Sequence, residues 1–321
     1  MHTPVKNIPC DHLMYKEIYR FGATALHRCE ACGLVFTGNS QAVVAPGAVY
    51  DKYYRNETAA RFDFGIEYVI RLFRFFRAFK VFTICPCAGS IMDVGSGRGF
   101  MLYYLKKYYS YKRAAGIQIS RNAVEFSRNE LGLEIFDKDL LEIPFKNAQF
   151  DVITMWHVLE HLAVPDEYIE KISGLLKERG KLIIEVPNFN SWTRMFTHMH
   201  WLSLDLKYHL TFFTPESLTA LLKRHGFTVE AFHTFSLEYS VFTSLQSIVS
   251  WLTKSDHDFF TWLQGGKFSF RIILHVPLFI ILSPVCLLIN ILLYFSKSGE
   301  VILIAAEKKQ ITVPSPLQCC R

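Results

Sequence analysis

The sequence is poor in charged residues and lacks an apolar run near its start. Asp, Glu, Lys and Arg make up only 20% of the 321 residues, whereas 50% are hydrophobic and 28 are Phe. This apolar content can fill the core of one large domain or two modest ones. Apolar surface beyond what that core buries needs an apolar environment elsewhere. Residues 1–7 contain no hydrophobic segment, so we expect no signal peptide there.

The chain also lacks long blocks of like charge. Its net charge is a mild +6, and the basic residues concentrate in residues 52–80 and 106–113. We therefore expect no nucleic-acid partner. Eight cysteines without an export signal favour a cytoplasmic protein whose thiols are free or bind metal over one with disulfides.

A third absence concerns the glycine fingerprint G-x-G-x-x-G of dinucleotide-binding folds. The chain instead places Gly95, Gly97 and Gly99 at every second position, after an apolar run, 91–94, that contains Asp93. Glycines accept positive φ and carry no Cβ, so a ligand can lie against such a turn. The pattern predicts strand, tight turn and helix around a nucleotide-like ligand, and it disfavours a nicotinamide enzyme.

This stretch resembles the first motif of class I S-adenosylmethionine (SAM)-dependent methyltransferases. The resemblance covers residues 86–235, with 299–309 as the last strand, and Trp156-His157-Val158-Leu159-Glu160-His161-Leu162 resembles the subgroup with His-x-x-Glu-His after strand four. It implies a doubly wound, mostly parallel, seven-stranded Rossmann-like α/β sheet with an antiparallel last strand. An α/β domain with an ordinary glycine turn is the alternative.

Apolar runs and helix signals fit such a sheet. We expect strands at 91–94, 114–119, 133–136, 150–153, 181–186, 227–235 and 300–306, and helices at 57–82, 100–109, 120–132, 165–180 and 214–226. Residues 189–213 contain no regular pattern, so we expect a long loop there that lies over the pocket as a substrate lid.

The resemblance assigns SAM to the glycine turn and to two strand ends. Gly95, Gly97 and Gly99 would line its methionine end, next to Asp93. The second strand of the family usually ends in an acid that accepts from the ribose hydroxyls, but Gln118 stands here. The loss of that charge-assisted bond costs on the order of 1 kcal/mol.

The adenine end falls after the third strand. The resemblance places Asp139 and Leu140 there, with the carboxylate accepting from the adenine amino group. Leu140 and Pro144 fix this register, which leaves Asp137 as a solvated loop charge.

Three histidines are candidate bases for methyl transfer to oxygen. His157 and His161 follow the fourth strand, where doubly wound sheets bind ligands, and His209 precedes the helix at 214–226. An imidazole with a near-neutral pKa suits proton removal. For each of them the alternative is a hydrogen-bonded structural histidine.

The cysteines near the start suggest a metal site. Cys29, Cys32 and Gly33 form a thiolate knuckle, and Cys10 with His12 could complete a Cys3His zinc site, although the spacing of this first pair is poor. The resemblance to methyltransferases with an N-terminal zinc ribbon supports zinc. A metal-free hairpin region is the alternative.

The helix expected at 57–82 carries Arg71, Arg74, Arg77 and Lys80 at threefold spacing. A basic helix with an aromatic face suits a membrane surface. The alternative is a helix along the sheet with its cations in water.

An insertion separates the last two strands. It includes an amphipathic run, 241–252, and then 24 residues, Ile272 to Phe295, without Asp, Glu, Lys or Arg. A helix of that length could cross a bilayer, but the next strand must return to the sheet, so we expect Pro284 to break it into a hairpin that dips into one leaflet. A buried core or dimer helix is the alternative.

We thus divide the chain into five parts: a zinc-ribbon-like region and linker at 1–49, a methyltransferase domain at 50–235, a hydrophobic membrane-associating insert at 236–298, the last strand at 299–309 and a tail at 310–321. We expect a SAM-dependent methyltransferase at the inner face of a membrane, acting on a small or lipid-linked acceptor, with O-methylation favoured. The rival is a non-catalytic scaffold with the same fold at the membrane.

Overall fold

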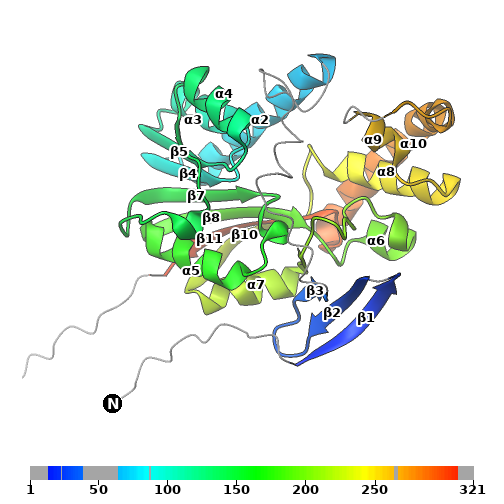
Figure 1. Cartoon of the computed structure of the whole chain (residues 1–321), viewed down its shortest axis with the longest axis horizontal. Helices are drawn as coiled ribbons and strands as arrows, with labels where there is room; N and C mark the ends of the chain where they lie inside the picture. The colour runs from blue at the N-terminus through cyan, green and yellow to red at the C-terminus, as the bar shows by residue number, and fades with distance from the viewer. Residues whose placement is uncertain (1–13, 23, 39–63, 87, 264–266, 310–321) are drawn as a thin grey trace, which may run out of the picture.

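The computed structural model describes residues 14–22, 24–38, 64–86, 88–263 and 267–309. Its centre is a seven-stranded sheet in the order β10-β11-β8-β7-β4-β5-β6 (Figure 1). Neighbouring strands are parallel except β11, which is antiparallel to both β10 and β8. The predicted sheet is confirmed. Its strands are β4 Ser90–Val94, β5 Arg113–Ile117, β6 Glu134–Phe136, β7 Phe150–Trp156, β8 Leu176–Pro187, β10 Phe227–His233 and β11 Val301–Lys308.

Helices cover both faces of this sheet, as Figure 1 shows. Two apolar clusters lie between the layers, one beneath each set of helices. All five residues of β4 are buried, as expected for a parallel strand covered on both sides. One face carries α2 Phe64–Ile84, α3 Phe100–Tyr108 and α4 Arg121–Asn129, and the other carries α5 Pro165–Leu175 and α7 Pro215–Arg224.

The ends of α5 and α7 depend on different signals. Helix α7 begins as predicted, with Pro215 in its first turn and reciprocal capping bonds between Thr214 and Ser217. Helix α5 ends at Leu175, so the predicted end at Gly180 is wrong. Leu176 already pairs with Phe150 in the sheet, and these strand hydrogen bonds take the backbone that would have continued the helix.

Residues 189–213 are not the structureless loop that we predicted. They contain α6 Trp192–Thr197, a 3-10 turn at His198–His200 and β9 Thr211–Phe212. Strand β9 completes a second, four-stranded antiparallel sheet, and Trp201 is fully buried against it. The other three strands of this sheet are β1 Tyr15–Phe21, β2 Thr24–Cys29 and β3 Val35–Thr37.

The insert forms α8 Ser240–Thr253, α9 Asp258–Leu263 and α10 Arg271–Ser296, which project from one end of the sheet (Figure 1). Helix α10 runs unbroken through Pro277 and Pro284, so the break predicted at Pro284 is wrong. The hairpin instead consists of α10 packed against α8. His275 and Asn290, two polar residues of the apolar run, are buried, and Asn290 donates a 2.7 Å hydrogen bond to Ser244 of α8.

Helix α2 packs along the sheet, as one of our two expectations had it, but two of its four predicted surface cations do not face water. Arg74 and Arg77 form ion pairs with Glu238, which lies just before α8, so their charges point neither to water nor to a membrane. Phe76 and Phe79 are exposed instead. The half-buried carboxylate of Glu238 is stabilised by cationic partners, and α2 supplies them.

Candidate functional site

The turn between β4 and α3 requires glycine. Gly95, Gly97 and Gly99 all have φ between 55° and 78°. A Cβ on Gly95 would lie 2.3 Å from a methyl carbon of Val158, and one on Gly99 would lie 2.4 Å from a methyl carbon of Leu133. The turn is also anchored, because the backbone N–H groups of Gly95 and Ser96 donate to the carbonyl of Ile117 at the end of β5.

Asp93 and Arg98 flank this turn. Asp93 is buried within β4 and accepts a 2.6 Å hydrogen bond from Thr154, and burial raises its pKa to about 6. Arg98 is buried and pairs with Glu67 of α2, which fastens that helix to the turn. Arg98 was not among the predicted site residues, although an arginine between two glycines of the motif was a visible signal.

Gln118 lies at the carboxyl end of β5 and is only 6% exposed. Its side-chain oxygen accepts a 3.0 Å hydrogen bond from the backbone N–H of Ser120. One acceptor of the amide therefore stabilises its own loop. The predicted contact with a ribose stays a prediction.

Asp139 follows β6 and has two intramolecular partners. One oxygen accepts from the N–H of Leu141 at 2.9 Å, and the other accepts from the hydroxyl of Tyr168. Burial and this carboxylate together raise the pKa of Tyr168 far above its usual range. Leu140 is buried beside it, whereas Asp137 is exposed and pairs with Arg128. The adenine contact of Asp139 and Leu140 stays a prediction.

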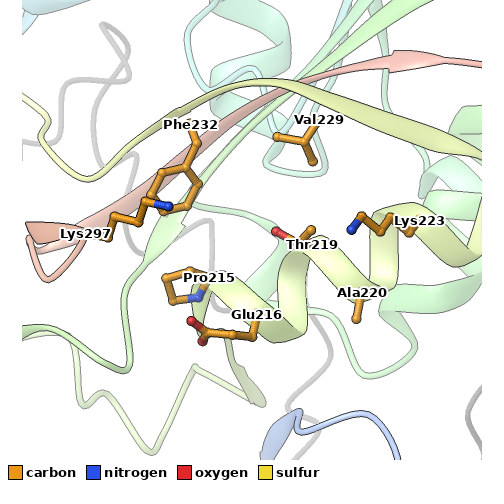
Figure 2. A pocket seen from close by; sticks show the side chains of 8 residues that line it. All are labelled: Pro215, Glu216, Thr219, Ala220, Lys223, Val229, Phe232 and Lys297. Atoms are coloured by element: carbon orange, nitrogen blue, oxygen red, sulfur yellow. The ribbon is translucent and has the colours of Figure 1, made fainter.

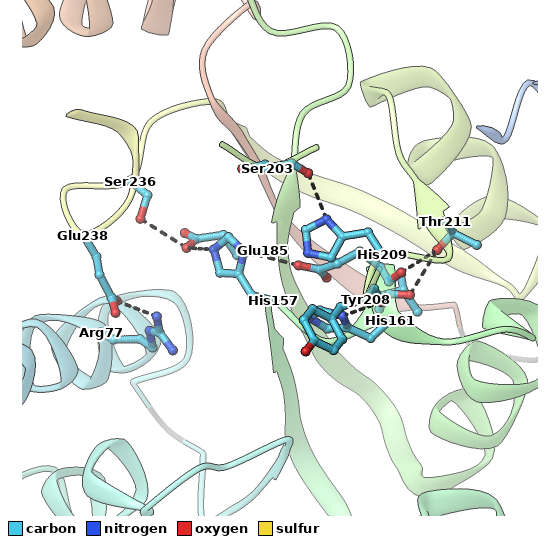
Figure 3. Close-up of polar contacts among 12 residues, drawn as sticks. Arg77, His157, His161, Glu185, Ser203, Tyr208, His209, Thr211, Ser236 and Glu238 are labelled. Carbon is cyan, nitrogen blue, oxygen red and sulfur yellow. Dashed lines mark hydrogen bonds and ion pairs between the residues drawn. The ribbon is translucent and has the colours of Figure 1, made fainter. Parts of the chain in front are cut away.

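His157 lies at the end of β7 between two carboxylates (Figure 3). Its Nδ1 is 3.3 Å from Glu160, its Nε2 is 3.2 Å from Glu185 of β8, and its ring lies 3.8 Å from that of Tyr239. Burial alone would lower the pKa of His157, but Tyr239 and the two carboxylates raise it to about 10. Both ring nitrogens then carry protons, so His157 is unsuited to the predicted role of base.

His161 and His209 come from different segments and meet beside Glu160. Their ring centroids are 4.8 Å apart, and Figure 3 shows them side by side. Nδ1 of His161 donates to the carbonyl of Tyr208, and Nδ1 of His209 donates to that of Ser203, both at 2.9 Å. Burial and the neighbouring His161 lower the pKa of His209 to about 4, so this imidazole is neutral.

Glu185 and Tyr239 are the other residues at this edge that we missed. Glu185 is buried, and its pKa falls to about 2 because His157 and nearby cations outweigh the effect of burial. An acid within the apolar strand 181–186 was a signal that could have found it. Tyr239 comes from the start of the insert, and no local pattern pointed to it.

A groove elsewhere contains none of the predicted site residues. It has a volume of about 490 Å³ and lies between α7 and β10 (Figure 2). The side chains that line it include Thr219, Lys223, Phe232 and Lys297. We assign it no role in the chemistry, because the polar clusters described above lie outside it.

The predicted metal site is only partly visible. Cys29 is buried at the end of β2, Cys32 is half-buried, and Gly33 turns the chain between β2 and β3 with φ 74°. Cys10 and His12 lie outside the described residues. Zinc binding there stays a prediction.

Curated proteins resemble part of the chain. The chain is 30% identical over 113 residues to a ubiquinone biosynthesis O-methyltransferase of Coxiella burnetii, a match that covers 33% of this chain and 47% of that one. It is also 28% identical over 156 residues to the protein of that name from Ruegeria. That match covers 45% of this chain and 62% of the Ruegeria protein. The chain thus spans less than two thirds of these curated relatives.

Solved structures resemble it at lower identity. A putative sarcosine dimethylglycine methyltransferase from Galdieria sulphuraria superposes with a TM-score of 0.49 at 14% identity, covering 75% of this chain and 86% of that one. A SAM-dependent methyltransferase from Archaeoglobus fulgidus superposes with a TM-score of 0.48 at 19% identity. The match covers 74% of this chain and 94% of that one. We infer no function from likenesses at this level.

The family itself is defined by a separate match. A family model described as a methyltransferase domain matches residues 66–231, just over half of the chain. This region holds the glycine turn, Gln118, Asp139 and the polar residues after β7. The chain therefore belongs to the methyltransferase-domain family and contains a class I SAM-dependent methyltransferase domain.

Proposed function

We propose that the protein transfers a methyl group from SAM to a hydroxyl oxygen of an apolar, membrane-borne acceptor. The observation that carries the proposal is that one edge of the sheet holds two different groups of residues. The ends of β4, β5 and β6 hold the glycine turn, Gln118 and Asp139, and the ends of β7 and β8 hold buried ionisable groups. Doubly wound sheets bind ligands at this edge.

The residues present suit SAM. Gly95, Gly97 and Gly99 carry no side chains and adopt positive φ, so the turn bends sharply and its backbone can approach the methionine end. Gln118 and Asp139 follow the next two strands and are placed to meet the ribose and the adenine. When bound, SAM supplies an electrophilic methyl group, and the protein contributes alignment of the acceptor with it.

Methyl transfer to a hydroxyl requires removal of a proton. Among the three histidines, His157 is held protonated between Glu160 and Glu185. His161 and His209 donate from Nδ1 to carbonyls, so in the neutral imidazole of each the lone pair is on Nε2. We place the acceptor hydroxyl beside this pair, where the loss of its proton is promoted. The name O-methyltransferase borne by the curated relatives favours oxygen as the acceptor atom.

The membrane part of the proposal depends on α10. This 26-residue helix is long and apolar enough to cross a membrane, and a core helix of a soluble protein can pass that test too. However, only 17% of an apolar 18-residue stretch of this helix is buried, and Leu274, Ile280 and Ile281 are about two thirds exposed. Both ends of the insert join the sheet, so we place α10 against one leaflet, at the inner face of the membrane.

The test has two steps. Calorimetry of the purified full chain with SAM should show binding, and a chain that binds no SAM would instead be a scaffold with the same fold. Membranes incubated with the protein and methyl-labelled SAM should then yield a labelled lipid-soluble product. A label found only in water-soluble products would contradict the membrane-borne acceptor.

Zinc at the N-terminal knuckle is a separate proposal. Cys29 and Cys32 lie on either side of a tight turn, in which Gly33 N–H donates to the Cys29 carbonyl, and such turns support thiolate ligation. Cys10 and His12 would complete the site. Metal analysis of a Cys29→Ser/Cys32→Ser double variant should show the loss of one zinc ion per chain, and an unchanged zinc content would refute the proposal.

A further inference from the structure

We propose that Glu160, His161 and His209 bind a divalent transition-metal ion at the carboxyl end of β7. Each residue offers one ligand atom, and these atoms all lie within 4.8 Å of one another. Two imidazoles and one carboxylate are a ligand set that suits zinc and its chemical neighbours. This site is separate from the cysteine knuckle at the N-terminus.

The hydrogen bonds of the two histidines fit ligation. Carbonyl oxygens can only accept, so Nδ1 of His161 donates to Tyr208 and Nδ1 of His209 donates to Ser203. This arrangement fixes the tautomer in which Nε2 carries the lone pair. Metal-binding histidines in proteins are commonly oriented by such a bond from the other ring nitrogen.

Glu160 gives an independent indication of a ligand. It is only 2% exposed, and its Oε2 makes no hydrogen bond within the described part of the chain. Its Oε1 has an ion-pair contact of 3.3 Å with His157. A buried carboxylate oxygen without a partner is costly, and a cation beside it would remove that cost. His157 would then orient the carboxylate from behind, as partners of metal-binding carboxylates do.

The backbone keeps the ligands together. Leu210 N–H donates to the carbonyl of Glu160 at 2.9 Å, and the hydroxyl of Thr211 points to the same carbonyl (Figure 3). Ligands at about 2.1 Å from a zinc ion in tetrahedral geometry are about 3.4 Å apart. The side chains therefore need to close by on the order of 1 Å, which rotation of the imidazoles can provide.

The use of the metal in catalysis rests on the proposed function, whereas metal binding itself does not. Three protein ligands leave a coordination position for the acceptor hydroxyl, whose pKa the ion would lower. The hydroxyl proton passes to water, the oxygen lone pair bonds to the methyl carbon, and the carbon–sulfur bond breaks with its electron pair kept by sulfur. The two histidines thereby act through the metal.

Cobalt(II) is the probe, because its visible spectrum distinguishes thiolate ligands from nitrogen and oxygen ligands. The full-length Cys29→Ser/Cys32→Ser variant is stripped of metal and titrated with Co²⁺, with equilibrium dialysis as a second readout. We expect one ion per chain, bound without a thiolate band. Absence of Co²⁺ binding in this background would overturn the proposal.

Single substitutions in that background locate the site. Glu160→Gln, His161→Gln and His209→Gln should each weaken Co²⁺ binding at least tenfold, whereas His198→Gln, at an exposed histidine, should leave it unchanged. Two histidine variants from separate segments keep the test decisive if Glu160→Gln fails to fold. Unchanged Co²⁺ affinity in both histidine variants would refute the site. SAM calorimetry on the same proteins tests the proposed function independently.

Discussion

Nε2 of His157 lies 3.2 Å from Oε1 of Glu185, and this ion pair joins the ends of β7 and β8. Ser236 donates to the same carboxylate oxygen, and the ring of Tyr239 contacts the same imidazole at a tilt of 42°. The start of the insert is therefore fastened to the edge of the sheet that holds the candidate site. Contact of the insert with a membrane would therefore be linked to the candidate site through these residues.

Replacing His157 should reduce stability. His157→Gln removes the cationic partner of two buried carboxylates, and we expect the free energy of unfolding to fall by about 3 kcal/mol, measured by urea denaturation. The double variant His157→Gln/Glu185→Gln removes one of the stranded charges as well, so it should lose less than the sum of the two single variants. Strictly additive losses would show that the pair does not interact.

Gly97→Ala should abolish SAM binding in calorimetry while the fold persists. The matched control is Gly132→Ala, because Gly132 has a similar φ of 60° and open space where a Cβ would lie. Each alanine should lower the free energy of unfolding by about 1–2 kcal/mol because it must adopt a left-handed backbone conformation. Only the change at Gly97 places a methyl group in the ligand's space, so equal SAM affinity in the two variants would contradict the assignment.

Gln118→Glu should tighten SAM binding by about fivefold, corresponding to roughly 1 kcal/mol from a charge-assisted hydrogen bond. One carboxylate oxygen can keep the bond from Ser120 N–H, and the other can face the ribose hydroxyls. Calorimetric Kd values for both proteins provide the comparison. Unchanged or weaker binding would place the ribose elsewhere.

Asp166 should make stability depend on pH. It joins the start of α5 to the end of α7 through Arg224 at 2.9 Å and His225 at 3.0 Å. Burial alone would raise the pKa of Asp166, but these hydrogen bonds and charges lower it. Because the folded pKa lies below the unfolded value of about 3.9, the stabilisation is fully present above that value and is lost as pH falls through the folded pKa.

The matching variant is Asp166→Asn. It should lower the free energy of unfolding by about 2 kcal/mol at pH 7, and the difference from wild type should disappear in strong acid. Glu134→Gln, which breaks an exposed pair with Arg113, serves as the control and should cost under about 0.5 kcal/mol. A difference at Asp166 that persists unchanged in strong acid would assign the effect to packing instead.

Ile281→Asp should release the protein from lipid vesicles without lowering its stability. Ile281 is 66% exposed on α10, so the charge disturbs a surrounding membrane far more than packing within the protein. Leu72→Asp, at a 51% exposed position on α2, is the control and should leave vesicle flotation unchanged. Equal flotation of wild type and Ile281→Asp would argue against α10 as the membrane contact.

Much of the fold was predictable because its signals are local. The apolar runs of β4, β7 and β8 predict buried strands, and the alternating glycines after Val94 predict a turn that only glycine can form. The cap at Thr214 and Pro215 fixed the start of α7 in the same way. These features depend on residues within a few positions of one another, so the chain itself contains the information.

Tertiary structure decided the rest. Leu176 became a strand residue because β7 offered it hydrogen bonds, and α10 stayed helical through Pro284 with α8 packed alongside it. His157 looked like a base in the sequence, but Tyr239 and Glu185, which come from distant segments, act together with the neighbouring Glu160 to raise its pKa and hold it protonated. The protonation state of a buried group depends on its desolvation and on charges brought close by packing, and neither quantity is encoded near the residue in the sequence.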